Sequence, residues 1–173
     1  MNAPAHLPLR ARFLNAMSSA ATTVNVVTTD GIAGRFGATV SAMASVSADT
    51  DKPTLLVCIY RNGASATAIL GNGAFCLNVL RADQSHISDA FAGKRRPDAG
   101  DKFAVAEWTR GPTGSPRLID PLVAFDCRVT NHLTVVTHEV VFGAVEDIFM
   151  AAGSPLVYAN RAYGTVQRFH RLE

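Results

Sequence analysis

The stretch GRFGATVSAMASVS, residues 34–47, is the part of this chain that decides both its fold and its site. It alternates very small side chains with β-branched ones, and it clusters Thr39, Ser41, Ser45 and Ser47. A strand that only builds a core has larger apolar side chains at alternate positions. Small side chains instead let a flat molecule approach the backbone, where amide groups and hydroxyls hydrogen-bond it. We therefore expect a strand over 36–45 that is also a binding surface.

The composition around this stretch is that of a folded protein. The chain has 173 residues, of which 48% are hydrophobic and 17% charged, and its net charge is +2. This length predicts a single domain with a real core, and these proportions exclude a disordered chain. The basic run 94–96 is short and is followed by Pro97 and Asp98, so no surface for nucleic acid is indicated.

Three cysteines, Cys58, Cys76 and Cys127, are widely spaced in apolar, strand-like surroundings. This spacing favours buried small hydrophobes in a reducing compartment over a disulfide framework or a metal site, and we expect no metal. The N-terminal residues lack the apolar core of a signal peptide, and no apolar segment approaches the roughly 20 residues of a membrane span. We expect a cytoplasmic protein that contacts neither membrane nor nucleic acid.

The remaining sequence predicts many short strands and few helices. Apolar residues at helical spacing predict a first amphipathic helix over 9–20, after a disordered tail over 1–8. Further helices are expected at 65–70, with Ser65 as N-cap and Gly71 ending it, and at 85–92. The strands besides 36–45 are expected at 22–29, 54–60, 74–80, 104–109, 122–130, 135–149, 156–159 and 165–169.

This order of elements favours a mainly β fold. Many short strands with brief helices predict an antiparallel, Greek-key-like barrel and not a stack of βαβ units. The segment over 93–103 is expected to be a polar hinge, too charged to be core. No linker or repeat divides the chain, so residues 9–173 form one expected domain.

Several motifs in this order resemble the short-chain flavin reductases, which supply reduced flavin to two-component monooxygenases. The motifs are TTVNVVTT, GRFGATVSAMASVSAD, PTLLVCI, SATAI, FCLNVL, DKF, THEVVFGAVEDI and PLVYANRAYG, between residues 13 and 163. The resemblance implies an FMN-binding split β-barrel that dimerises and binds FMN or FAD in a groove. It also implies that NADH or NADPH donates the hydride.

The resemblance also implies which residues bind the flavin. The ring system is expected against a strand of small residues, where backbone amides approach it closely. The helix N-terminus at Ser65 suits a flavin phosphate, because its amides are unpaired and its dipole is positive. The expected flavin-binding residues are Phe36, Gly37, Ala38, Thr39, Val40, Ala42, Met43, Cys58, Ile59, Tyr60, Ser65, Ala66, Lys102 and Phe103.

A second group of residues is expected to meet the nicotinamide cofactor. His138 matches a family histidine beside the flavin ring that helps to seat the nicotinamide, and it is the candidate catalytic residue. Asn160, Arg161 and Tyr163 match a family segment that meets NAD, where Arg161 is expected to pair with the pyrophosphate. Without the family resemblance, the position of His138 at a strand end would favour a structural or exposed residue.

The predicted function is therefore hydride transfer from NAD(P)H to FMN or FAD, with the reduced flavin passing to a separate oxygenase. The sequence has no GxGxxG or P-loop motif, and no hydrolase motif such as GxSxG or HExxH. Three alternatives stay open: a non-catalytic flavin- or haem-binding split barrel, a reductase that keeps its flavin and acts on another substrate, and a lipocalin-type barrel. The lipocalin reading explains the strand of small residues poorly, because such barrels bind their ligand inside.

Overall fold

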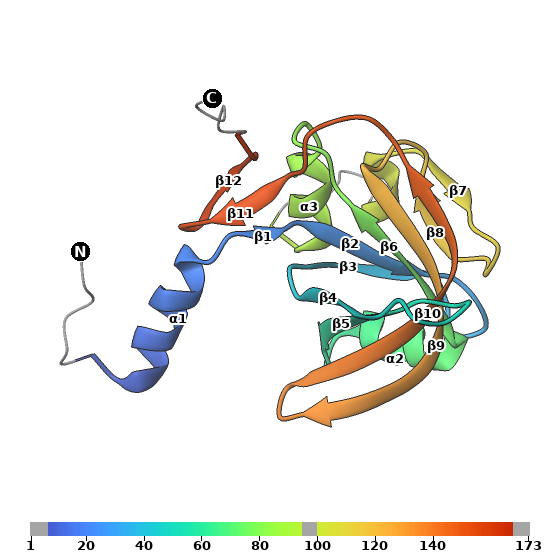
Figure 1. Ribbon diagram of the computed structural model, residues 1–173, viewed down its shortest axis with the longest axis horizontal. Coiled ribbons are helices and arrows are strands. Elements are labelled where there is room, and N and C mark those ends of the chain that lie inside the picture. The colour runs from blue at the N-terminus through green and yellow to red at the C-terminus, as the bar shows by residue number, and fades with distance from the viewer. Residues whose placement is uncertain (1–6, 95–99, 168–173) are drawn as a thin grey trace.

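The computed structural model describes residues 7–94 and 100–167 and contains three α-helices in those ranges (Figure 1). The helices are α1 (Leu9–Ser19), α2 (Ala64–Asn72) and α3 (Ser85–Phe91), and a 3₁₀ turn follows at Lys102–Val105. None of the helices in these ranges is long and apolar enough to span a bilayer. Most of the predicted tail over 1–8 and part of the predicted hinge lie outside the described residues.

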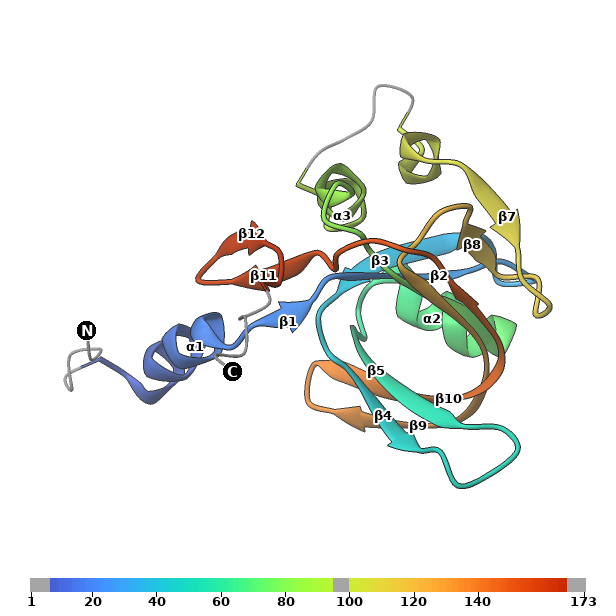
Figure 2. The same ribbon diagram turned by 45° about the horizontal axis from the view of Figure 1, so that its top comes forward.

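One antiparallel sheet forms the body of the molecule. Its seven strands are ordered β3-β2-β6-β9-β10-β5-β4. Their bounds are β2 (Asn25–Thr29), β3 (Phe36–Val40), β4 (Met43–Ser47), β5 (Thr54–Tyr60), β6 (Ala74–Val79), β9 (Val123–Val135) and β10 (His138–Met150). The sheet curls until its two edges face each other (Figure 2), which confirms the mainly β, antiparallel prediction.

Two smaller sheets flank this body. One joins β1 (Thr22–Thr23), β11 (Val157–Ala159) and β12 (Ala162–Gly164). The other pairs β7 (Trp108–Arg110) with β8 (Pro116–Leu118). The sequence did not predict β8, because its three residues include a proline and show no alternation.

The predicted strand over 36–45 is wrong as a single element. The chain leaves β3 at Val40 and enters β4 at Met43, and these strands lie on opposite edges of the sheet. Between them, the carbonyl oxygen of Ala42 accepts a hydrogen bond from the Cys58 amide (3.1 Å). The short crossing over 41–42 therefore joins the two edges and leaves a split between β3 and β5.

Apolar residues fill both sides of the central strands. The barrel interior is packed by Val57, Phe75 and Val141, which are fully buried. A second cluster, between the sheet and α3, includes Phe91 and Leu118. Strands β2 and β6 are buried along their whole length because they lie between these two clusters.

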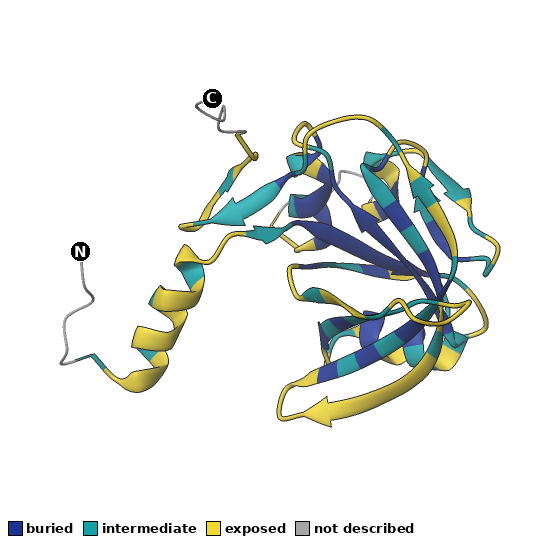
Figure 3. Ribbon diagram, in the orientation of Figure 1, coloured by how far each residue is buried: buried dark blue, intermediate teal, exposed yellow. Residues whose placement is uncertain are grey.

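Helix α1 forms where it was predicted, but its apolar face is not buried. Leu9 is 78% exposed and Phe13 60% exposed, and the helix stands away from the barrel (Figure 3). It is fixed at its C-terminal end, where the amide of Asn160, between β11 and β12, donates to the carbonyl oxygen of Ser18. The helical periodicity therefore predicts the helix correctly, but the apolar face of α1 does not pack into the core of the chain.

Three further boundaries differ from the prediction. Helix α2 runs from Ala64 through Gly71 to Asn72, and its N-cap is Gly63 instead of the predicted Ser65. Its C-cap is Gly73, whose φ of +67° is the left-handed conformation that favours glycine. The predicted strand over 104–109 begins only at Trp108, because the preceding residues form the 3₁₀ turn. The turn buries Phe103, so this end of the predicted polar hinge belongs to the core.

The C-terminal strand prediction over 165–169 is wrong at residues 165–167, which form no strand, and its last two residues lie outside the described residues. The strand lies earlier, at Ala162–Gly164, because residues 160–161 form a tight turn that pairs it with β11. Both turn residues have left-handed backbone, with φ of +51° at Asn160 and +62° at Arg161. Asparagine favours the first position of such a turn, but the second position usually holds glycine, so Arg161 leaves the turn poorly marked in the sequence.

The loop between β7 and β8 is held on the barrel by a buried carboxylate. Asp126 on β9 is 2% exposed and accepts hydrogen bonds from the Thr113 amide (2.7 Å) and the Thr113 hydroxyl (2.6 Å). Burial raises the pKa of Asp126 above its usual value, and the hydrogen bonds from Thr113 only partly offset this.

Candidate functional site

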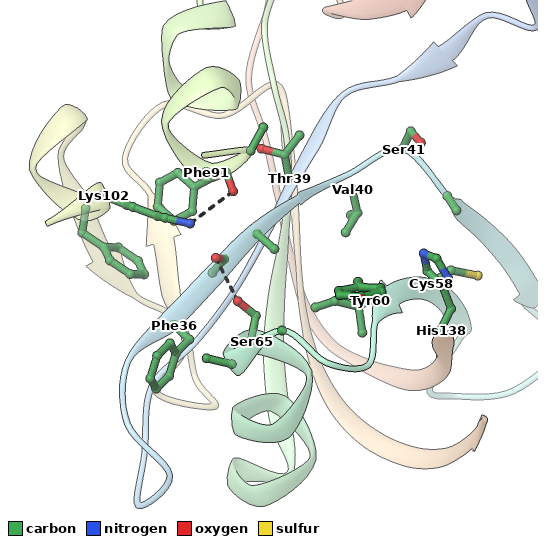
Figure 4. A pocket seen from close by; sticks show the side chains of 18 of the residues that line it. Phe36, Thr39, Val40, Ser41, Cys58, Tyr60, Ser65, Phe91, Lys102 and His138 are labelled. Atoms are coloured by element: carbon green, nitrogen blue, oxygen red, sulfur yellow. Dashed lines mark hydrogen bonds between the residues drawn. The ribbon is translucent and has the colours of Figure 1, made fainter. Parts of the chain in front are cut away.

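A groove of about 1240 Å³ lies at the split in the barrel. One wall is β3, and the other is formed by the end of β5 and the start of α2 (Figure 4). The groove extends from Phe36 and Lys102 at one end to Ser41 and His138 at the other. Five residue steps along a strand cover roughly 16 Å, so the wall is long enough for an extended molecule.

Strand β3 presents free backbone groups to this groove. It is an edge strand that, among the described strands, pairs only with β2. The carbonyl oxygen of Gly37 points away from β2 and accepts a hydrogen bond from the Ser65 hydroxyl (2.9 Å). Backbone groups alternate in direction along a strand, so every second residue points to the same side. The amide and carbonyl of Thr39, two residues after Gly37, therefore also point away from β2 and toward the groove. A planar heterocycle in the groove therefore meets both donors and acceptors.

The end of the groove near Phe36 is positively charged. Arg35 and Lys102 both line it, and so does the N-terminus of α2. The N-cap of α2 is Gly63, which gives no side-chain hydrogen bond, and the first turn has no acidic residue. The carboxylate of Asp101 also lines this end and accepts a hydrogen bond from the Phe103 amide (2.9 Å). Two cations and a helix N-terminus outweigh one carboxylate, so this end suits an anion.

The opposite end of the groove is aromatic. Register pairs His138 on β10 with Tyr60 on β5, so their rings lie side by side, edge to face, with centroids 5.9 Å apart. The His138 Nδ1 atom lies 3.0 Å from the Thr137 hydroxyl. Cys58 lies on the same wall, and partial burial raises the pKa of its thiol. Cys58 is thus half-buried and lines the groove, in contrast to the buried Cys76 and Cys127.

A side cavity of about 260 Å³ adjoins the groove. The two spaces share Thr39, Val40, Ser41 and Ala92, so the end of β3 and the end of α3 lie between them. Two tyrosines form its outer wall: the Tyr158 and Tyr163 rings lie edge to face at 5.3 Å.

The cavity wall at Tyr163 is fixed by α3. The Tyr163 hydroxyl donates to Asp89 Oδ1 (2.7 Å) and lies 3.0 Å from Ser88 Oγ. Burial raises the pKa of Tyr163. The Lys94 ammonium lies 5.3 Å from the Tyr163 ring centre and 3.7 Å from Asp89. The cavity therefore offers flat apolar walls with a cation at its rim.

Most of the predicted site residues are brought together in the groove. Those that line it are Phe36, Gly37, Ala38, Thr39, Val40, Ala42, Cys58, Ile59, Tyr60, Ser65, Lys102, Phe103 and His138. Met43 and Ala66 do not line it and instead pack against or within the barrel core. Tyr163 lines only the side cavity.

Asn160 and Arg161 line neither space among the described residues. The Arg161 guanidinium donates instead to the Asn15 side chain of α1 (2.7 Å). The turn that they form fixes α1 in the position that the structure shows.

Several groove residues were not predicted. Arg35 and Ser41 belong to the quoted stretch itself, and their polar side chains next to its small residues were an available signal. The others either adjoin predicted residues in the sequence or come from α1 and α3, which only the fold brings to the groove. These are Phe13, Leu14, Met17, Gly63, Ala64, Phe91, Ala92, Gly100 and Asp101.

The chain belongs to the family of the flavin reductase like domain, whose model matches residues 17–167. The FMN reductase (NADH) RutF of Escherichia coli O157:H7 strain EC4115 is 44% identical over 158 residues, which are 90% of this chain and 93% of that protein.

Solved structures agree with this assignment. Component B of nitrilotriacetate monooxygenase from Mycobacterium thermoresistibile superposes with a TM-score of 0.81 at 30% identity, covering 91% of this chain and 87% of that one. BorF, the flavin reductase component of a bacterial two-component tryptophan halogenase, gives 0.81 at 28% identity, covering 92% and 99%. The split-barrel prediction is confirmed.

Proposed function

We propose that this protein is an NADH-dependent flavin reductase that acts on FMN or FAD. The supporting observation is the groove at the barrel split, whose wall of small residues presents free backbone donors and acceptors. The groove occurs in a chain of the flavin reductase like domain family, with a 44% identical relative named for FMN and NADH. When both are bound, the nicotinamide gives a hydride to the flavin, and this chemistry needs no catalytic triad.

The protein's own contribution is to hold the two molecules in position. We place the flavin ring system against Thr39 and Ser41, where backbone groups of the β3 edge hydrogen-bond its polar rim. The side chain of the flavin then extends toward Ser65 and the anion-binding end. Gly37 leaves room for the Phe91 ring, which also lines the groove, and the small side chain of Ala38 lets the ligand lie close to the strand. Fixed backbone dipoles there stabilise charge on the reduced product.

The nicotinamide is placed at the aromatic end. His138 and Tyr60 lie where the second ring must stack, and a His138 nitrogen is available to hydrogen-bond the carboxamide. The side cavity next to it, with Tyr163 at its wall and Lys94 at its rim, suits the remaining half of the dinucleotide. Asn160 and Arg161 take part only if α1 moves, because their hydrogen bonds now go to that helix.

The reduced flavin passes to a separate oxygenase in this proposal. Two structural relatives are named as components of a monooxygenase and of a two-component halogenase. A homodimer is also proposed, because the exposed apolar residues Phe13, Leu14 and Met17 of α1 line the groove and need a cover. A second copy that covers α1 would close the groove at the subunit interface.

The test of the function is a purified-protein assay with NADH and either FMN or FAD. The proposal expects loss of NADH absorbance that depends on added flavin, and no oxidation with either flavin would contradict it. Gel filtration of the protein with FMN tests how the flavin is held: a rate insensitive to added flavin, with the flavin retained on the column, would indicate a bound prosthetic group. The same column with light scattering gives the mass, and a monomer would contradict the dimer.

A further inference from the structure

Arg35 is fixed at the positive end of the groove by an aromatic cluster. Its guanidinium carbon lies 3.9 Å from the centre of the Phe103 ring. Phe103 is itself buried and packs edge to face with Phe91 (5.0 Å) and Trp108 (5.1 Å). A guanidinium that uses its face on a ring keeps its N–H edges free for planar acceptors. The aromatic cluster thus holds a cation in place without neutralising it.

Arg35 makes no ion pair with the carboxylates in the described parts of the chain. Seven such pairs are present there, and Arg35 is in none of them. The carboxylate that shares this end of the groove is Asp101, which is engaged with the Phe103 amide. Lys102 places its ammonium 3.5 Å from the Phe91 carbonyl oxygen, so it too is directed at this end.

We propose that Arg35 is the residue that binds the phosphate group of the flavin substrate. The inference rests on the proposed function and adds a determinant of which flavin is used. With the ring system near Ser41, the sugar-alcohol chain follows β3 back to Phe36, and its terminal phosphate meets Arg35. Arginine binds a phosphate through two parallel N–H···O bonds, which lysine cannot make.

The three common flavins differ at this group. FMN ends in a phosphate monoester, FAD continues as a diphosphate, and riboflavin has no phosphate. Arg35 therefore favours FMN and FAD over riboflavin, and it acts on flavin binding rather than on hydride transfer.

The experiment compares Arg35→Gln with the wild type on FMN and on riboflavin. Loss of charge-assisted hydrogen bonds raises the KM for FMN about 10- to 100-fold, while the KM for riboflavin and the kcat with either flavin stay unchanged. Arg35→Lys keeps the charge and restores part of the FMN affinity. The matched control is Arg117→Gln, because Arg117 lies 4.2 Å from the Phe149 ring centre, the same kind of contact outside the groove.

Two results would overturn the proposal. If Arg35→Gln raised the KM for FMN and riboflavin equally, Arg35 would only support the packing of Phe103. If neither KM changed, the phosphate would bind elsewhere. Quenching of the fluorescence of Trp108, the single tryptophan, reports FMN and riboflavin binding without NADH. Because this binding assay needs neither NADH nor turnover, it tests the Arg35 proposal even if the protein does not reduce flavin.

Discussion

A methyl group added at Gly37 tests whether the groove wall is packed as the structure shows. Gly37 is on β3, and a Cβ atom there would lie 2.6 Å from Cε1 of Phe91 and 3.0 Å from the Val27 carbonyl oxygen. Both distances are shorter than van der Waals contact, so the buried Phe91 ring must move. Overpacking of this kind costs about 1–3 kcal/mol of the free energy of unfolding. For a chain of this length, Gly37→Ala should lower Tm by about 2–12 °C.

The effect should also reach flavin binding, because the Phe91 ring packs against Phe103, on which Arg35 lies. Thermal unfolding followed by circular dichroism gives the stability, and the KM for FMN gives the effect on the groove. In a double-mutant cycle, Phe91→Leu should relieve the contact. The double variant should then be less destabilised than the sum of the single variants, by about 1 kcal/mol.

The control is Gly164→Ala on β12, where the nearest atom to an added Cβ is 3.7 Å away, an ordinary contact. This variant should change stability by less than about 0.5 kcal/mol. Gly37→Ala with wild-type Tm and a wild-type KM for FMN would refute the packing of this wall. Strict additivity in the cycle would refute the assignment of the clash to Phe91.

Two other predictions concern titratable residues. His138→Ala should raise the KM for NADH about 2- to 10-fold, which is the loss expected for one hydrogen bond. The Kd for FMN should stay near normal. An unchanged KM for NADH and an unchanged kcat would show that His138 is not part of the site. The raised pKa of Asp126 means that folding takes up a proton between the unfolded pKa, about 3.9, and the folded one. This contribution to stability is therefore complete at low pH and lost as the pH rises through the folded pKa. Urea unfolding at several pH values should show that Asp126→Asn lacks this slope, and an identical slope in both proteins would contradict the burial argument.

Local sequence patterns predict the strands that are marked by their own residue types. The sequence predicts β5 at 54–60 and β6 within 74–80, because each is a continuous apolar run; β6 is buried along its whole length and β5 at alternate positions. The groove residues on β3 are predicted by the small size of that stretch and by the family resemblance, and those on β5 by the resemblance alone. These features depend on residue type, which a single sequence shows directly.

The break over 41–42 depended on information that no local pattern contains. Serine is common in turns and alanine is not, so Ser41-Ala42 gives only a weak local signal for the end of a strand. The strand ends there because β3 pairs with β2 on one side of the barrel and β4 pairs with β5 on the other. Such a change of partner is a property of the closed sheet. For the same reason Arg35 and Phe103, which are 68 positions apart in the sequence, gave no sign that they meet.

The same break explains why the stretch of small residues forms a site and not simply a weak strand. If β3 continued into β4 on one edge, its outer backbone groups would need a further strand or solvent to satisfy them. Because the chain crosses the barrel at 41–42, these groups face β5 and α2 across a gap instead. The Ser65 hydroxyl satisfies the Gly37 carbonyl, while the backbone groups of Thr39 remain available to a ligand in the groove. In the proposed function, residues 37–39 are small so that the flavin can complete the hydrogen bonding of this edge, as a neighbouring strand does elsewhere in the sheet.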